Sequence, residues 1–343
     1  MSVLTRLAKV AASGLVMAVT FAATASAQEV KLRYSNWLPP TYFVMTEILQ
    51  PWMKDIERVT EGRVTFDILP KVVGTVPGQY DVVRDGLADV AMLTPSLQPN
   101  RFPLISGMEL PFLGDSALTR SPASWRAYEK YLIPTGIFPE VVVLGLFAGN
   151  TAQIVTTSKE IKVAGDVSGL KLRVPSPTVS ELVGLLGGTP ISKPFTEIYE
   201  LATSGVIDGG VIPPETMPAF KLEGALKQVS QVPGGLANTI NIVAINKDKW
   251  NTISEADRAA ILEVSGEKLA VLSGEVHQKN TDTARKVLMD AGVKFSTIDE
   301  AGTQSIKTVL EPIRGKWVDS AKAAGLANPD EFLDYLEAEI AKN

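Results

Sequence analysis

Apolar and polar residues alternate along several short segments of the chain, and this alternation predicts strands. The segments KLRYSNW (31–37) and RVTFDIL (63–69) carry apolar residues at every second position, as half-buried strands do. Helical spacing over residues 45–60 lies between them, and we expect Pro51 to kink that helix. A short helix and a third strand are expected over residues 80–93. This β-α-β-α-β order predicts a parallel sheet with right-handed crossovers.

The second half of the chain repeats this pattern. Buried strands are expected at VVVLGLF (141–147) and within GLKLRVPSP (169–177), and a further helix and strand within residues 194–210. The alternation of residues 238–250 resembles that of the first sheet, so we expect this strand to return there. Residues 254–286 read as one helix on the order of 50 Å long, at 1.5 Å per residue. Such a helix would run along two lobes and tie them together.

The N-terminus has the features of a secretory signal peptide. Arg6 and Lys9 precede an apolar run over residues 10–23, and Ala25-Ser26-Ala27 forms a small-residue cleavage site. A transmembrane anchor is the alternative, but the apolar run is short for a bilayer span. We therefore predict export to the periplasm and cleavage after residue 27.

Length, charge and composition exclude several classes of function. Residues 28–343 are too many for one compact core, so we expect two domains. The net charge of −5, more negative once the signal peptide is lost, argues against nucleic-acid partners and anionic membranes. The chain has no cysteine, which excludes disulfides, thiol nucleophiles and thiolate metal sites. The single histidine, His277, is expected to be a solvated helix residue.

The segment GLKLRVPSP raises the main question about chemistry. Its strand pattern stops at Pro175, because proline lacks the donor that a strand's ladder needs. Arg173 therefore stands at the carboxyl end of a strand, where open parallel sheets bind ligands. One interpretation is a surface arginine whose stem covers apolar atoms. The other is an anchor whose planar guanidinium forms two charge-assisted hydrogen bonds with a carboxylate.

Aromatic and acidic residues also allow both structural and functional interpretations. Trp37 and Tyr42 follow the first strand, where they suit either core packing or an apolar pocket wall. For Asp81, Asp85 and Asp89, solvation and helix-end electrostatics are favoured. No pair of residues offers an obvious acid and base, and the GxSxG, P-loop and GxGxxG motifs are absent. Nothing in the sequence therefore argues for an enzyme.

Taken in order, these motifs resemble those of the extracytoplasmic substrate-binding proteins of tripartite ATP-independent periplasmic (TRAP) transporters. The most specific part runs from GLKLRVPSP to VIDGG (169–210), supported by YDVVRDGLADVAML (80–93) and ELPFL (109–113). The resemblance covers residues 30–335. It implies an α/β, two-lobed periplasmic binding protein fold, with crossover strands and a long helix spanning both lobes.

The resemblance also implies how the chain is divided and what it binds. In it, Arg173 makes the bidentate contact with the carboxylate of an organic acid, and the partner is a TRAP membrane permease. It implies no cofactor, no nucleic acid and no membrane span in the chain itself. The implied division is residues 1–27 for the signal peptide, 28–150 and 238–278 for lobe I, and 151–237 and 279–343 for lobe II.

Departures from the family pattern narrow the predicted ligand. Many sugar-acid members carry a second arginine at the position of Gln153 and an asparagine at that of Ile212. The keto-acid branch has Glu-Trp at Val211 and Ile212 and binds a metal there. Because these positions are neutral or apolar here, we predict no metal and a monocarboxylate with an apolar or aromatic body. The predicted ligand-binding residues are Arg173, Gln153, Trp37, Tyr42, Phe195, Val211, Ile212 and Glu215.

Three alternatives stay open at this point. The ligand could be a polar dicarboxylate or a sugar acid, with Lys193 or Arg101 as a second cation. The chain could be a periplasmic lyase-type enzyme that uses Tyr199 or Glu215. It could also be a ligand-binding module that serves a sensor kinase rather than a permease.

Overall fold

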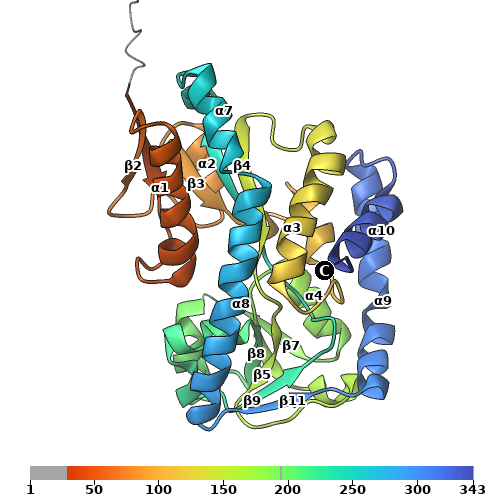
Figure 1. The fold of residues 1–343 in the computed structure, drawn as a ribbon. Coiled ribbons are helices and arrows are strands. Elements are labelled where there is room, and N and C mark those ends of the chain that lie inside the picture. The colour runs from red at the N-terminus through yellow and green to blue at the C-terminus, as the bar shows by residue number, and fades with distance from the viewer. Residues whose placement is uncertain (1–28, 194, 343) are drawn as a thin grey trace, which may run out of the picture.

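The computed structural model describes residues 29–193 and 195–342, and it has two lobes, each built on one sheet (Figure 1). The predicted signal peptide, residues 1–27, lies outside this part of the chain. Helices pack around both sheets, so the predicted α/β fold with two lobes is confirmed.

Lobe I contains a five-stranded sheet, in which the parallel order predicted for the first three strands is confirmed. The returning strand is confirmed as well, because it pairs antiparallel with its neighbours on both sides. In spatial order the strands are β2 (Val64–Ile68), β1 (Val30–Ser35), β3 (Val90–Leu93), β10 (Ile240–Asn246) and β4 (Val141–Ala148). The helices are α1 (Gln50–Val59), α2 (Gln79–Arg84), α3 (Ala117–Ala127), α6 (Lys247–Asn251) and α7 (Glu255–Glu263).

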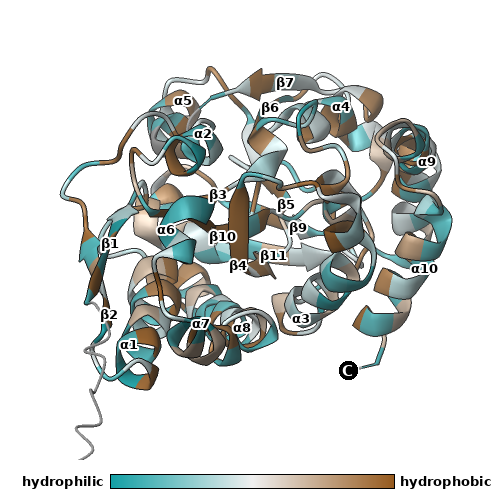
Figure 2. Ribbon diagram, turned by 90° about the horizontal axis from the view of Figure 1, so that it is seen from above, coloured by the Kyte–Doolittle hydropathy of each residue, from teal (hydrophilic) through white to brown (hydrophobic). Residues whose placement is uncertain are grey.

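Helix α1 continues directly from a π-helical turn, Val44–Leu49, and Pro51 lies in its first turn. The helix geometry therefore changes where the proline was expected to disturb it. Figure 2 shows the hydrophobic strand β10 in the middle of the molecule, with α8 and α3 along one side. Apolar residues of β10 such as Ile240 and Ile242 are fully buried, whereas Asn241 between them is only partly buried, which accounts for the alternation at this end of the strand.

Lobe II contains a six-stranded sheet. Its spatial order is β11 (Lys294–Thr297), β9 (Gln228–Gln231), β5 (Gln153–Thr156), β8 (Gly209–Ile212), β6 (Lys171–Val174) and β7 (Thr189–Ser192). Strands β6, β7 and β8 are parallel, and α4 (Pro177–Leu185) and α5 (Ile198–Thr203) belong to their connections. Strand β8 needs its first glycine, because a Cβ on Gly209 would lie 2.1 Å from the Val155 carbonyl oxygen of β5.

Two crossover segments and one helix connect the lobes. The segment between β4 and β5 runs beside the segment between β9 and β10, and the N–H groups of Gly149 and Ala152 donate to the carbonyls of Thr239 and Ala237. Helix α8 (Glu267–Asp290) contacts β4 and α3 in lobe I and the 3₁₀ turn Pro214–Thr216 in lobe II. The predicted crossovers and spanning helix are therefore confirmed.

The length of that helix was predicted wrongly. The segment forms two helices, α7 and α8, which are separated at Gly266. Gly266 has a φ of 58°, its N–H donates to Leu144 O, and a Cβ there would lie 2.8 Å from the Trp125 ring. Helix α8 has 24 residues and is about 36 Å long at 1.5 Å per residue. Periodicity missed the break because both helices keep helical spacing.

The two C-terminal helices pack against different lobes. The predicted division of the chain between the lobes stays a prediction. Helix α9 (Glu300–Ala323) contacts α4 in lobe II. Helix α10 (Pro329–Ile340) packs against α3 in lobe I, although residues 279–343 were assigned to lobe II. The C-terminal segment thus forms a further bridge between the lobes (Figure 1).

Candidate functional site

The carboxyl ends of β6, β7 and β8 meet at one edge of the lobe II sheet, and this edge faces lobe I. Helix α4 follows β6 directly and contacts the 3₁₀ turn Pro95–Leu97, which follows β3 of lobe I. A void of about 10 Å³ between the lobes is lined by Glu109 and Pro111 of lobe I and by Ser176 and Val179 of lobe II. The strand ends of both lobes therefore meet at the position where parallel sheets bind ligands.

Arg173 lies at this edge and is buried, with only 6% of its surface exposed. Its backbone pairs with Gly210 of β8 and Ile191 of β7. Its Nε donates to the carbonyl of Lys193 over 2.9 Å, and its guanidinium carbon lies 5.1 Å from the centre of the Phe195 ring. Burial lowers the pKa of Arg173 to about 10. No acidic side chain of the described part of the chain forms an ion pair with it.

A buried cation without a countercharge is costly, and such a group is stable only when something pairs with it. The guanidinium of Arg173 keeps its Nη groups as donors beside an aromatic ring. This geometry suits a planar carboxylate, which accepts two parallel hydrogen bonds from one guanidinium. Of the two interpretations of Arg173, the surface cation is wrong, because the side chain is buried.

Glu215 of lobe II and Tyr42 of lobe I lie near each other at this edge. Glu215 lies in the 3₁₀ turn after β8, is 7% exposed, and has the side chain of Asn150 near it. Its Oε2 is buried without a hydrogen-bond partner among the described residues. Burial raises the pKa of Glu215 to about 7. Burial and the nearby Glu215 charge both raise the pKa of Tyr42, which comes from lobe I.

The other predicted site residues have structural contacts of their own. Trp37 donates from Nε1 to Met92 O over 2.8 Å and packs on the lobe I core. Gln153 is buried, and its Oε1 accepts from the Val232 N–H at the start of a crossover segment. Its amide nitrogen is the end that could reach a ligand. The Gln153 amide therefore holds the crossover segment, and its contact with a ligand stays a prediction.

Val211 and Ile212 are fully buried on β8 and belong to the two different hydrophobic clusters of the protein. Ile212 pairs with Gln153 across the sheet. Both side chains contribute to core packing, and their role as walls of the ligand site stays a prediction. Phe195 is half-buried, and its ring centre lies 4.5 Å from that of Phe220.

The structure separates the residues on which the alternative functions depended. Arg101 is exposed, pairs with Asp81 over 2.8 Å and lies on Tyr80. The ammonium group of Lys193 is exposed and lies 3.5 Å from Glu197. Tyr199 lies on the outer surface of lobe II, whereas Glu215 is buried between the lobes, so these two do not form one site.

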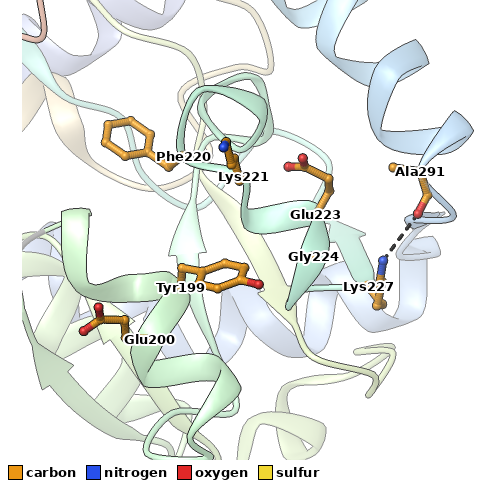
Figure 3. A pocket seen from close by; sticks show the side chains of 8 residues that line it. All are labelled: Tyr199, Glu200, Phe220, Lys221, Glu223, Gly224, Lys227 and Ala291. Carbon is orange, nitrogen blue, oxygen red and sulfur yellow. Dashed lines mark hydrogen bonds between the residues drawn. The ribbon is translucent and has the colours of Figure 1, made fainter.

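A larger cavity of about 640 Å³ opens on lobe II, and Arg173 is not among its lining residues (Figure 3). The figure shows the Tyr199 ring and several charged side chains around it, with Lys227 donating to Ala291 O. Its lining residues are Tyr199, Glu200, Phe220, Lys221, Glu223, Gly224, Lys227 and Ala291. No side chain that lines it belongs to the predicted ligand-binding set.

The environment of His277 was predicted incorrectly, and Asn150 was missed. The prediction of a solvated His277 is wrong, because it is 3% exposed, its Nδ1 donates to Ser273 O, and its ring packs edge-on against Phe43. Burial lowers the pKa of His277 to about 4. Asn150 follows β4 and donates to His277 O over 2.9 Å. Its position directly after a strand that leads into a crossover is the signal that could have identified it.

The fold and the buried Arg173 define a two-lobed receptor for an anionic solute. Residues 35–320 match the family of bacterial extracellular solute-binding proteins, family 7 (DctP). The chain belongs to this family, which confirms the resemblance to TRAP substrate-binding proteins. Its members are solute-binding receptors rather than enzymes, take small organic acids and work with TRAP permeases. No helix within residues 29–342 has the length and apolar character of a membrane span.

Solved structures of TRAP solute-binding proteins share this fold. One from Bordetella bronchiseptica, with bound (R)- and (S)-mandelate, is 38% identical, with a TM-score of 0.86 over 91% of this chain and 99% of that one. One from Rhodoferax ferrireducens with copurified benzoate is 27% identical, with a TM-score of 0.83 over 91% and 98%. A marine metagenome protein with 3-hydroxybenzoate is 29% identical, with a TM-score of 0.84 over 92% and 99%.

Proposed function

We propose that this protein is a periplasmic receptor that captures an aromatic monocarboxylate between its lobes and delivers it to a TRAP permease. The observation that carries the proposal is Arg173, buried at the interlobe edge with no countercharge among the described residues. The signal peptide at residues 1–27 would direct export and then be removed. The ligands of the similar solved structures, mandelate, benzoate and 3-hydroxybenzoate, support the choice of an aromatic acid.

In this proposal, Arg173 holds the carboxylate and aromatic side chains enclose the ring. A micromolar ligand needs a binding free energy of about −8 kcal/mol. One charge-assisted hydrogen-bonded contact supplies about 1.5–3 kcal/mol of this, so burial of the ligand's body must supply most of the rest. Phe195, whose ring lies under the guanidinium, and Tyr42 from the opposite lobe are the side chains placed to do so.

Calorimetric titration of ligand-free protein with aromatic, aliphatic and sugar acids tests the proposal. We expect benzoate, mandelate or a similar acid to bind at micromolar concentrations. At a concentration of 100 Kd such a ligand stabilises the fold by about 2.7 kcal/mol, which is a rise of several degrees in Tm. Binding of uronates or of dicarboxylates alone would show that the ligand class is wrong.

Variants of Arg173 and Arg101 test whether Arg173 holds the carboxylate. Arg173→Lys keeps the charge but loses the bidentate fork, so we expect its affinity to fall about tenfold or more. Arg173→Met loses both the charge and the fork, so we expect no detectable binding. Arg101→Met is the control, because Arg101 is exposed and paired with Asp81. Unchanged affinity in Arg173→Met would exclude Arg173 as the anchor.

A further inference from the structure

The edge of the lobe II sheet that carries Arg173 also contains a buried polar atom with no partner among the described residues. Oε2 of Glu215 has almost no exposed surface and no hydrogen bond within the described part of the chain. Buried polar atoms in native proteins are nearly always hydrogen-bonded, so a group with no partner needs an explanation. A ligand that enters the space between the lobes would supply one.

Glu215 and Arg173 both lie at the carboxyl ends of neighbouring parallel strands, the edge at which such sheets bind ligands. Arg173 pairs across the sheet with Gly210, and Glu215 follows Gly210 by five residues. Five residues span no more than about 18 Å even when fully extended, and this connection contains a 3₁₀ turn that shortens it. No hydrogen bond or ion pair joins the two side chains within the described residues, so neither satisfies the other.

The surroundings of Glu215 favour a neutral hydrogen-bonding group. Tyr42 lies near enough to be affected by its charge, and the polar side chain of Asn150 is also near it. A second carboxylate placed beside Glu215 would be repelled by it and stripped of water. A hydroxyl both donates and accepts one hydrogen bond, so it suits the Glu215 carboxyl in either protonation state.

We infer that Glu215 determines specificity by hydrogen-bonding to a hydroxyl group of the ligand, so that the receptor prefers hydroxylated aromatic monocarboxylates to the parent acids and to dicarboxylates. The inference rests on the proposed function, since it places the ligand's carboxylate on Arg173. Burial raises the pKa of Glu215 to about 7, so at neutral pH the carboxyl is protonated in part and offers a donor as well as acceptors.

The test compares acids that differ only in one substituent. Calorimetry on wild-type protein measures benzoate against 3-hydroxybenzoate, phenylacetate against mandelate, and benzoate against benzene-1,3-dicarboxylate. We expect the hydroxyl to strengthen binding about tenfold in at least one of the first two pairs, and the second carboxylate to weaken it. Equal binding within each pair overturns the inference and leaves the proposed function standing. Failure of every aromatic acid to bind overturns both.

Variants assign the preference to Glu215. In Glu215→Leu we expect the hydroxyl preference to vanish while the parent acid binds within about threefold of wild type. In Glu215→Gln, which keeps a donor and an acceptor, we expect part of the preference to remain and the dicarboxylate to bind better. Glu200→Leu is the control, because Glu200 lies at the outer cavity of lobe II. A preference that persists in Glu215→Leu overturns the inference, and if that variant does not fold, the wild-type pairs decide.

Discussion

Replacing Arg173 by methionine should stabilise the ligand-free protein while it destroys binding. Arg173 is buried, and burial lowers its pKa from its ordinary value to about 10. This shift corresponds to a cost of about 3 kcal/mol for keeping the guanidinium charged in the fold, since one pKa unit is about 1.4 kcal/mol. The cost is present at every pH below about 10, because the side chain is charged in both states there.

Part of this gain is offset by contacts that methionine cannot make. The hydrogen bond from Nε to Lys193 O contributes about 1 kcal/mol, and the contact with the Phe195 ring contributes about 0.5–1 kcal/mol. The Lys193 backbone lies at an exposed residue, so its carbonyl can turn to water. We therefore expect Arg173→Met to be about 1–2 kcal/mol more stable than wild type, with a Tm a few degrees higher.

The assay is thermal and denaturant unfolding of protein that has been freed of copurified ligand by unfolding and refolding. Arg120→Met is the comparator, because burial lowers the pKa of Arg120 to about 10 as well. Arg120, however, donates to Leu113 O, Gly114 O and the Thr151 hydroxyl, and methionine would lose all three of these bonds. We expect this variant to be destabilised by about 2–4 kcal/mol. If Arg173→Met is less stable than wild type, the cation has a structural role and our reasoning fails.

Three further predictions concern pH and glycines. Burial raises the pKa of Glu109 to about 8, so its contribution to the free energy of unfolding falls as pH rises from about 4.5 to 8. Glu109→Gln should therefore flatten that part of the stability–pH curve. Burial lowers the pKa of His277 to about 4, so its contribution to stability is lost as pH falls from about 6.5 to 4, and His277→Gln should reduce the acid sensitivity. Gly209→Ala should prevent lobe II from folding normally, whereas Gly315→Ala, in open space on α9, should raise stability by about 0.5–1 kcal/mol in urea titrations.

The order of elements was predictable because each depends on local spacing. The parallel strands β1 to β3 and the return of β10 follow from alternating apolar residues and from the rules of chain connection. The break between α7 and α8 was not predictable in this way. It depends on the close approach of Gly266 to the Trp125 ring, a contact between residues far apart in the sequence.

In the candidate site, too, local features were predictable from the sequence and contacts between distant residues were not. Arg173 was identified from the sequence because a proline ends its strand, and its position at a strand end then follows from topology. The burial of His277 was missed because the residue facing its ring, Phe43, comes from the other end of the chain. The burial of Glu215 also depends on tertiary packing, since its neighbours Tyr42 and Asn150 come from separate loops.

The size of the ligand matters because its partners lie on different lobes. Arg173 and Glu215 belong to lobe II, whereas Tyr42 belongs to lobe I and the crossover at Gln153 connects the two. A ligand favours closure only to the extent that it binds the closed form more tightly than the open one. A small anion on Arg173 alone would contact one lobe and leave this equilibrium unchanged. In the proposed function, an aromatic acid that extends from Arg173 to Tyr42 would be stabilised by both lobes and would therefore favour their closure.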